Sequence, residues 1–188
     1  MPPSTSTPFS VPELRSAVRG RLITPDDADY DEARTVAAGG VDRRPAVIVR
    51  VADAADVQHV VELARETGME LAVRCGGHSG LGHGVTEGGI VIDLRDMKGI
   101  EIDPEARTAW AETGLTAREV TEAAAKHGLA IGFGDTGSVG IGGLTLGGGV
   151  GYFVRTDGLT IDNLIAAEIV TADGQLRLVD AETEPELF

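Results

Sequence analysis

The glycine content of residues 132–151 is the strongest constraint on how this chain can fold. Ten of these twenty residues are glycine, in a chain with 26 glycines among 188 residues. A glycine inside a helix or strand costs about 0.5–1 kcal/mol relative to alanine. So dense a run therefore predicts tight backbone laid against another part of the molecule or a ligand, instead of an ordinary helix or strand.

Another glycine-rich loop, the first of the two along the chain, follows a short apolar strand expected at residues 71–73. It reads Arg-Cys-Gly-Gly-His-Ser-Gly-Leu-Gly over residues 74–82. Glycines adopt positive φ readily and let backbone N–H groups approach phosphate oxygens. Two such loops in one chain favour a long ligand with a diphosphate over a single phosphate. His78 is the one nucleophile in this loop.

A nicotinamide-binding interpretation competes for the second loop. Gly132, Gly134 and Gly137 match the G-x-G-x-x-G pattern, and Asp157 lies twenty residues further on. That pattern requires a helix that opens at its third glycine. Seven more glycines between residues 138 and 151 argue against a helix there, so the spacing alone is weak evidence for a dinucleotide fold of this kind.

Four motifs in sequence order indicate a different family. They are R-x-G-G-H-S-x-x-G at residues 74–82, G-x-x-G-L-T-L-G-G-G-x-G at 140–151, D-G-L-T-I-D-N at 157–163 and E-I-V-T-A-D-G at 168–174. Together they resemble the FAD-linked oxidoreductases of the p-cresol methylhydroxylase/vanillyl-alcohol oxidase (PCMH-type) family, in the berberine-bridge-enzyme-like branch. The resemblance extends from about residue 43 to the end of the chain.

The resemblance implies an α+β fold, namely a PCMH-type FAD-binding domain of two α+β lobes with the substrate domain absent. It also implies that His78 is joined to the 8α-methyl group of FAD. A neutral imidazole can attack that carbon once the methyl group has lost a proton. The cofactor-binding residues carried over by the resemblance are Arg74, Cys75, Gly76, Gly77, His78, Ser79, Gly82, Thr136, Gly137, Val139, Gly142, Gly143, Thr145, Gly148, Gly149, Gly151, Ile169 and Val170.

Three positions refine this expectation. Members with two covalent links carry a cysteine where this chain has Thr136, so a single link through His78 is expected. Val139 falls where the family's residue shapes oxygen access to the flavin, and valine is compatible with an oxidase. Arg74 is open to two interpretations of equal weight, a phosphate contact or an ion pair with a carboxylate, whereas Cys75 is expected to fill space under its loop.

The end of the chain limits the functional prediction. In full-length relatives a segment like residues 184–188 continues into a substrate domain, so no catalytic residue is assigned here and enzyme activity of the chain alone is left open. A donor substrate is expected only for a full-length enzyme. An apolar patch where that domain would pack is expected to favour self-association or a partner.

Three functions from different classes follow from these observations. The first is the FAD-binding part of an oxidoreductase that takes hydride from an alcohol, sugar or amine and passes electrons to dioxygen. The second is a standalone flavin-binding module without turnover. The third is a non-catalytic remnant that binds nothing.

Composition excludes several other classes of protein. The formal net charge of −14 repels phosphate backbones and anionic membranes, so nucleic-acid binding is not expected. The single cysteine, Cys75, allows no internal disulfide. No stretch reaches the roughly 20 apolar residues of a membrane span, and a cytoplasmic location is expected. A metal site at His83 is disfavoured because no acidic or cysteine cluster accompanies it.

The pattern of apolar residues divides the chain into a flexible tail at 1–8, a first lobe at 9–73 and a second lobe at 74–188. Helices are predicted at residues 11–21, 53–67 and 116–127. Gly68 is expected to end the second helix, and Thr116 with Glu119 to form a capping box at the start of the third. Residues 24–44 are expected to form a polar connection. Strands are predicted at 46–51, 71–73, 89–94, 99–103 and 108–112, with a hairpin of 167–171 and 175–179.

Overall fold

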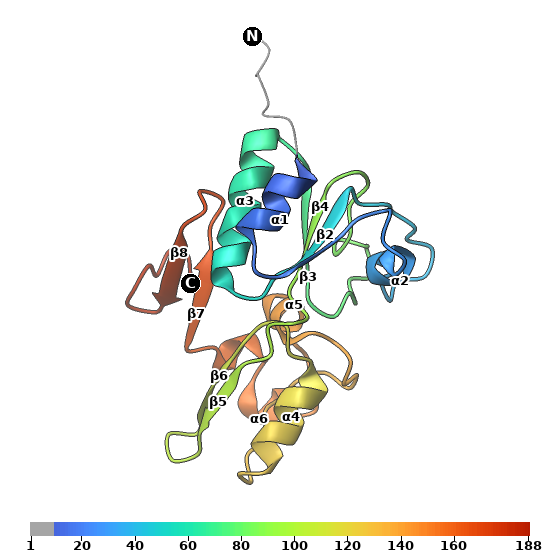
Figure 1. Cartoon of the computed structure of the whole chain (residues 1–188). Coiled ribbons are helices and arrows are strands. Elements are labelled where there is room, and N and C mark those ends of the chain that lie inside the picture. The colour runs from blue at the N-terminus through green and yellow to red at the C-terminus, as the bar shows by residue number, and fades with distance from the viewer. Residues whose placement is uncertain (1–9) are drawn as a thin grey trace.

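The computed structural model describes residues 10–188, and the tail predicted at residues 1–8 lies outside them. Its main element is a four-stranded sheet with strand order β1-β2-β4-β3, of which Figure 1 labels β2, β3 and β4. Strand β1 pairs antiparallel with β2, and β4 lies parallel between β2 and β3. The strands are β1 (Arg21–Ile23), β2 (Val47–Arg50), β3 (Leu71–Arg74) and β4 (Ile90–Asp93).

Apolar residues cover both faces of this sheet, as the near-continuous apolar runs of β2 and β4 require. Val47, Val49 and Ile92 point to the face covered by α1 (Val11–Ala17) and α3 (Ala54–Thr67). Ile48 and Val91 alternate with them and point to the face covered by α2 (Tyr30–Arg34). The sheet is therefore buried between helices, and its carboxyl edge presents the loop that follows β3.

Helix α3 begins and ends where the sequence predicts. The Asp53 carboxylate accepts the backbone N–H of Asp56, which caps the N-terminus. Gly68 ends the helix in the left-handed region at φ 69°. The Asp56 side chain is itself buried and accepts the backbone N–H groups of Arg19, Gly20 and Ala52, so it ties the chain before β1 to the start of α3.

The second lobe contains short elements around a smaller core (Figure 1). Helix α4 (Ala117–Ala125) carries the predicted capping box between Thr116 and Glu119. Leu115, Val120 and Ile141 meet in the core of this lobe. Its elements are the hairpin of β5 (Ile100–Asp103) and β6 (Thr108–Ala111), α4 (Ala117–Ala125), α5 (Ile141–Leu146), α6 (Val154–Asp157) and a 3-10 turn (Ile161–Asn163).

The last hairpin returns to the first lobe. Strands β7 (Ala166–Val170) and β8 (Leu176–Asp180) pair around a turn where Gly174 has φ 81°. Gln58 Nε2 donates to the carbonyl oxygen of Gly174 at 2.7 Å, and Arg65 Nη1 donates to that of Asp173 at 3.0 Å. The hairpin is therefore anchored to α3 through its turn.

The predicted lobe boundary after residue 73 is wrong. Strand β4 lies beyond that boundary, yet it forms the centre of the first-lobe sheet because it pairs with both β2 and β3. Sequence patterns cannot reveal the pairing of β4 with β2 and β3, because the neighbours of a strand in a parallel sheet depend on tertiary packing. The first lobe therefore extends through β4.

Three further elements differ from prediction. Helix α1 ends at Ala17, and residues 21–23 form β1 because they pair with β2. Residues 141–146 form a helix despite Gly142 and Gly143, because the preceding chain pairs with residues 115–117 and Ile141 is buried. Helix α2 interrupts the connection predicted at residues 24–44.

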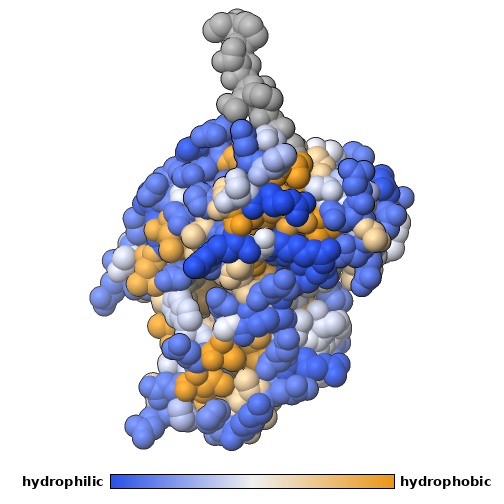
Figure 2. All heavy atoms as spheres, viewed as in Figure 1, coloured by the Kyte–Doolittle hydropathy of each residue, from blue (hydrophilic) through white to orange (hydrophobic). Residues whose placement is uncertain are grey.

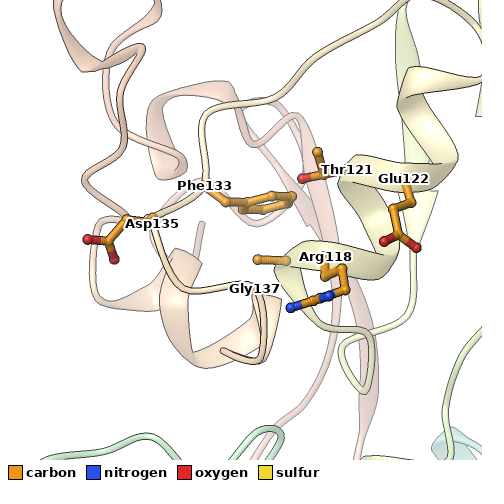
Figure 3. A pocket seen from close by; sticks show the side chains of 8 residues that line it. Arg118, Thr121, Glu122, Phe133, Asp135 and Gly137 are labelled. Atoms are coloured by element: carbon orange, nitrogen blue, oxygen red, sulfur yellow. The ribbon is translucent and has the colours of Figure 1, made fainter.

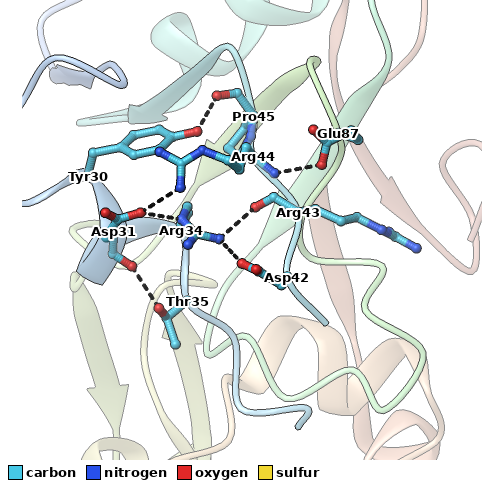
Figure 4. Close-up of polar contacts among 9 residues, drawn as sticks. All are labelled: Tyr30, Asp31, Arg34, Thr35, Asp42, Arg43, Arg44, Pro45 and Glu87. Atoms are coloured by element: carbon cyan, nitrogen blue, oxygen red, sulfur yellow. Dashed lines mark hydrogen bonds and ion pairs between the residues drawn. The ribbon is translucent and has the colours of Figure 1, made fainter. Parts of the chain in front are cut away.

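That polar connection is held by a network of hydrogen bonds and ion pairs (Figure 4). Tyr30 Oη donates to the carbonyl oxygen of Pro45 at 2.6 Å, and the Arg44 guanidinium lies 5.0 Å from the centre of the Tyr30 ring. Arg34 pairs with Asp31 and Asp42, which raise the pKa of its guanidinium. The segment is thereby fixed beside the loops that follow β3.

None of the helices among residues 10–188 combines the length and apolarity needed to cross a membrane.

Candidate functional site

The two glycine-rich loops meet at a backbone contact between Gly76 and Gly140. A Cβ atom on Gly76 would lie 2.5 Å from the backbone nitrogen of Gly140. A Cβ atom on Gly140 would lie 2.5 Å from the Cβ of Cys75 and from the backbone nitrogen of Gly76. Glycine is therefore required on both sides, because any side chain would force the loops apart.

The chain entering α4 holds the second loop in place. The N–H of Ala117 donates to the carbonyl oxygen of Val139 at 2.9 Å, and that of Arg118 donates to Gly137 at 3.0 Å. On the other side, the N–H of Ile141 donates to the carbonyl oxygen of Leu115 at 2.9 Å. Residues 137–141 are thus fixed along a short extended ladder.

Residues of the polar connection at 24–44 hold the first loop in place by hydrogen bonds. The N–H of Ala37 donates to the carbonyl oxygen of Gly77 at 3.0 Å. Arg43 Nη1 donates to the carbonyl oxygens of Gly82 at 3.0 Å and Val85 at 2.9 Å. Within the loop, the Ser79 hydroxyl accepts the N–H of His83 at 3.3 Å. These bonds fix the loop on both sides of His78.

His78 lies where the loops meet, with its imidazole exposed. Its Nε2 atom lies 3.1 Å from the hydroxyl oxygen of Ser138, a residue of the other loop. Sequence reasoning singled out His78 but missed Ser138, because no local pattern shows that residues 60 positions apart are neighbours. An accessible nucleophile thus lies between two glycine-rich backbones.

The Arg74 side chain serves the fold and is not available to a phosphate. It is fully buried, its Nη2 lies 2.7 Å from a carboxylate oxygen of Asp93, and it donates to the carbonyl oxygen of Ala33 at 2.6 Å. Burial lowers the pKa of its guanidinium, and the Asp93 carboxylate opposes that effect. Of the two interpretations left open for the Arg74 side chain, the structure shows the ion pair with a carboxylate and not the phosphate contact.

Cys75 fills space beneath the loops, as predicted. It is half-buried and packs against the first core. Burial raises the pKa of its thiol, while the backbone N–H groups of Gly143 and Gly142 lower it by hydrogen bonding. The thiol therefore bridges the first loop to α5 and has little thiolate character near neutral pH.

The last glycines of the run make room for the protein's own atoms. A Cβ atom on Gly149 would lie 2.1 Å from the Thr160 hydroxyl, and one on Gly151 would lie 1.8 Å from the carbonyl oxygen of Phe133. Gly148 takes φ 95°, and its carbonyl oxygen accepts the N–H of Ile161. By contrast, a Cβ on Gly143 would meet no atom within 4 Å.

The contact between the two loops at Gly76 and Gly140 is called the seam here. Other predicted cofactor-binding residues form no hydrogen bond across this seam. Thr136 is exposed and donates to Asp135 at 3.1 Å. Thr145 accepts the N–H of Gly148 through its carbonyl oxygen. Among residues 10–188, no hydrogen bond links Ile169 or Val170 of β7 to either glycine loop. Their predicted place near an adenine stays a prediction.

A cavity of about 310 Å³ lies on the α4 side of the second loop (Figure 3). Arg118, Phe133 and Gly137 line it together with Glu122 and Asp135, and the Asp135 carboxylate points away from Phe133 in this view.

In the part of the chain that the structure describes, no cluster of three or more acidic, histidine or cysteine side chains could hold a metal.

Comparison with known families decides what kind of ligand this arrangement holds. Residues 45–180 match the FAD binding domain family, so the match includes both glycine loops and His78. The chain belongs to this family. FAD is thereby the cofactor of the fold, and the dinucleotide fold of nicotinamide enzymes is excluded.

The relatives of this FAD-binding domain are oxidoreductases. (R)-6-hydroxynicotine oxidase of Paenarthrobacter nicotinovorans is 38% identical over 172 residues, which cover 92% of this chain and 38% of the relative. A solved structure of 6-hydroxy-D-nicotine oxidase from Arthrobacter nicotinovorans matches 90% of the chain and 38% of its own length, with 38% identity and a TM-score of 0.89. The predicted PCMH-type α+β fold is confirmed.

Two more distant solved structures share this fold. Berberine-bridge-enzyme-like 1 of Physcomitrella patens is 27% identical, with a TM-score of 0.89 over 95% of the chain and 39% of its own length. A grass pollen allergen with glucose dehydrogenase activity is 27% identical, with a TM-score of 0.82 over 88% of the chain and 37% of its own length. The chain thus spans less than half the length of these relatives.

The residues at the seam fit an FAD molecule. Both loops offer bare glycine backbone, Gly143 has open space beside it, and the His78 imidazole is accessible. Two apolar side chains in or next to the second loop are largely exposed, Leu146 at 81% and Tyr152, which directly follows Gly151, at 85%. These features suit a ligand with a diphosphate chain and a flat aromatic ring system.

Proposed function

We propose that this FAD-binding domain attaches FAD covalently through His78 and serves a flavin-dependent oxidoreductase. The observation that carries the proposal is the exposed His78 imidazole between two glycine-rich backbones that touch at Gly76 and Gly140. When bound, FAD supplies a two-electron acceptor for hydride. The chain's part is to hold the cofactor by backbone amides and to present one imidazole nitrogen to its 8α-carbon.

The donor and the final electron acceptor are part of the same proposal. Relatives include an oxidase of 6-hydroxynicotine and a glucose dehydrogenase, which supports an amine, alcohol or sugar donor for the complete enzyme. Dioxygen as acceptor is supported by Val139, which the resemblance places beside the flavin. A variant of the pollen allergen in which valine replaces one isoleucine is a glucose oxidase, and the proposal takes Val139 to be the corresponding residue.

The proposal extends to an exposed apolar surface that a further region or a second copy of the chain would cover, whereas the cytoplasmic location stays a prediction. Figure 2 shows apolar residues at the surface of the β7–β8 hairpin, where Leu178 is 50% exposed. Leu187 and Phe188 are exposed as well. Burial of these side chains against a substrate-binding region or another copy of the chain would remove apolar area from water.

Covalent attachment predicts a single mass change. The wild-type chain, supplied with FAD and then denatured, is expected to gain the mass of one FAD, whereas His78→Ala gains none. Intact-mass spectrometry measures this directly. His83→Ala is the matched control, because His83 is also exposed and lies five residues away, and it is expected to retain the gain. A gain in His78→Ala would assign the link to another residue.

Gly143→Ala is expected to separate stability from cofactor binding. A Cβ there meets no protein atom, and alanine in a helix is favoured by about 0.5–1 kcal/mol over glycine, so the unfolding midpoint without FAD should rise slightly. If FAD lies against this backbone, its affinity falls. Urea unfolding and fluorescence titration with FAD measure the two effects, and unchanged FAD affinity would place the cofactor elsewhere.

A further inference from the structure

Ser138 contacts one of the two imidazole nitrogen atoms through which His78 could react. Its hydroxyl oxygen lies 3.1 Å from Nε2, at hydrogen-bonding distance. Among the described residues, no hydrogen bond to the His78 Nδ1 atom is formed. The two nitrogens therefore differ, because Nε2 faces a partner from the opposite loop and Nδ1 does not.

The backbone around Ser138 is fixed well enough to hold this contact. The carbonyl oxygens of its two neighbours, Gly137 and Val139, both accept N–H groups from the chain entering α4. On the histidine side, the carbonyl oxygen of Gly77 accepts the N–H of Ala37. Both side chains are exposed, so a ligand that covers them would exclude water and strengthen the bond between them.

We propose that Ser138 is a positioning residue that selects Nδ1 of His78 as the nucleophile for flavin attachment. The inference rests on the proposed covalent link. The Ser138 oxygen accepts the Nε2–H proton and thereby favours the tautomer whose lone pair is on Nδ1. With the oxygen at Nε2, a carbon electrophile has no room to approach that atom.

The bonds and electrons of this step balance with dioxygen as oxidant. The 8α-methyl carbon loses one C–H bond and gains a bond to Nδ1. The imidazole loses its Nε2 proton after the bond has formed. The two protons released and the electron pair of the broken C–H bond reduce the flavin, and dioxygen takes up both electrons and both protons to give hydrogen peroxide.

The tautomer can be measured without any cofactor. Long-range ¹H–¹⁵N NMR of the histidine-labelled chain, with His78→Ala to identify the signal, is expected to show the Nε2–H form in the wild type. Ser138→Ala is expected to lose this bias, and Ser138→Thr, which retains a hydroxyl, to keep it. Circular dichroism checks that each variant is folded. An Nδ1–H form in the wild type, or an unchanged tautomer in Ser138→Ala, would overturn the proposal.

Attachment provides the second test. Ser138→Ala is expected to gain FAD mass about five- to tenfold more slowly than the wild type, the size expected for one hydrogen bond, and Ser138→Thr to restore the rate. In the isolated flavinyl peptide, NMR contacts from the 8α-methylene to the histidine β-protons identify attachment at Nδ1. Attachment at Nε2 would overturn the proposal. Absence of any FAD gain in the wild type would contradict the covalent function, while the tautomer measurement still decides the role of Ser138.

Discussion

Replacing Asp93 with alanine is expected to lower the free energy of unfolding by about 3–5 kcal/mol. The Asp93 and Arg74 side chains are both 0% exposed, and their charged atoms lie 2.7 Å apart. Removal of the carboxylate leaves the Arg74 guanidinium buried without its counter-charge, at the start of the His78 loop. Urea denaturation followed by circular dichroism measures the change.

The other ion pairs of Asp93 make its replacement more destabilising than the replacement of Arg74. Its carboxylate also lies 2.8 Å from Arg95 Nε and 3.6 Å from Arg50 Nε, so it keeps two partners when Arg74 is replaced. Arg74→Met is therefore expected to cost less than Asp93→Ala, because the buried charge left behind remains paired. Asp96→Ala is the matched control, since Asp96 is an exposed acid three residues away. A loss below about 1 kcal/mol for Asp93→Ala would contradict this account.

Gly140→Ala is expected to open the seam between the two loops. Gly140 has φ −70° and ψ 133°, a conformation that alanine adopts freely, so backbone strain does not enter. The added Cβ would lie 2.5 Å from atoms of Cys75 and Gly76, one of them a backbone nitrogen that cannot rotate away. Overpacking of this kind costs about 1–3 kcal/mol, and the loops can escape the clash only by separating.

The functional consequence of this substitution is expected to exceed its effect on stability. Separation moves Ser138 and Gly142 away from His78, so FAD attachment should fall below detection in intact-mass spectra. Gly39→Ala is the control, because it adds the same methyl group without a contact and lies outside both glycine-rich loops. Normal flavin attachment by a folded Gly140→Ala chain would show that the cofactor does not need the seam.

Local chemistry was sufficient to predict most individual elements. Runs of β-branched residues predicted β2 and β4, Asp53 and Gly68 marked the ends of α3, and the Thr116–Glu119 pair marked the start of α4. Each of these signals acts over a few residues, because caps and turns are satisfied by near neighbours. Elements that depend on distant partners, such as β1 and α5, were missed for the same reason.

For the candidate site as well, features that depend on local motifs were predicted and contacts between distant residues were not. The sequence alone determined that two glycine-rich loops exist, that His78 is their nucleophile and, through its motifs, that the ligand is FAD. Only the tertiary structure decided that Gly76 touches Gly140, that Ser138 meets His78, and that Arg74 turns inward to Asp93. The physical reason is that motifs record which residues a loop needs, whereas contacts between loops depend on how the sheet and α4 bring distant backbone together.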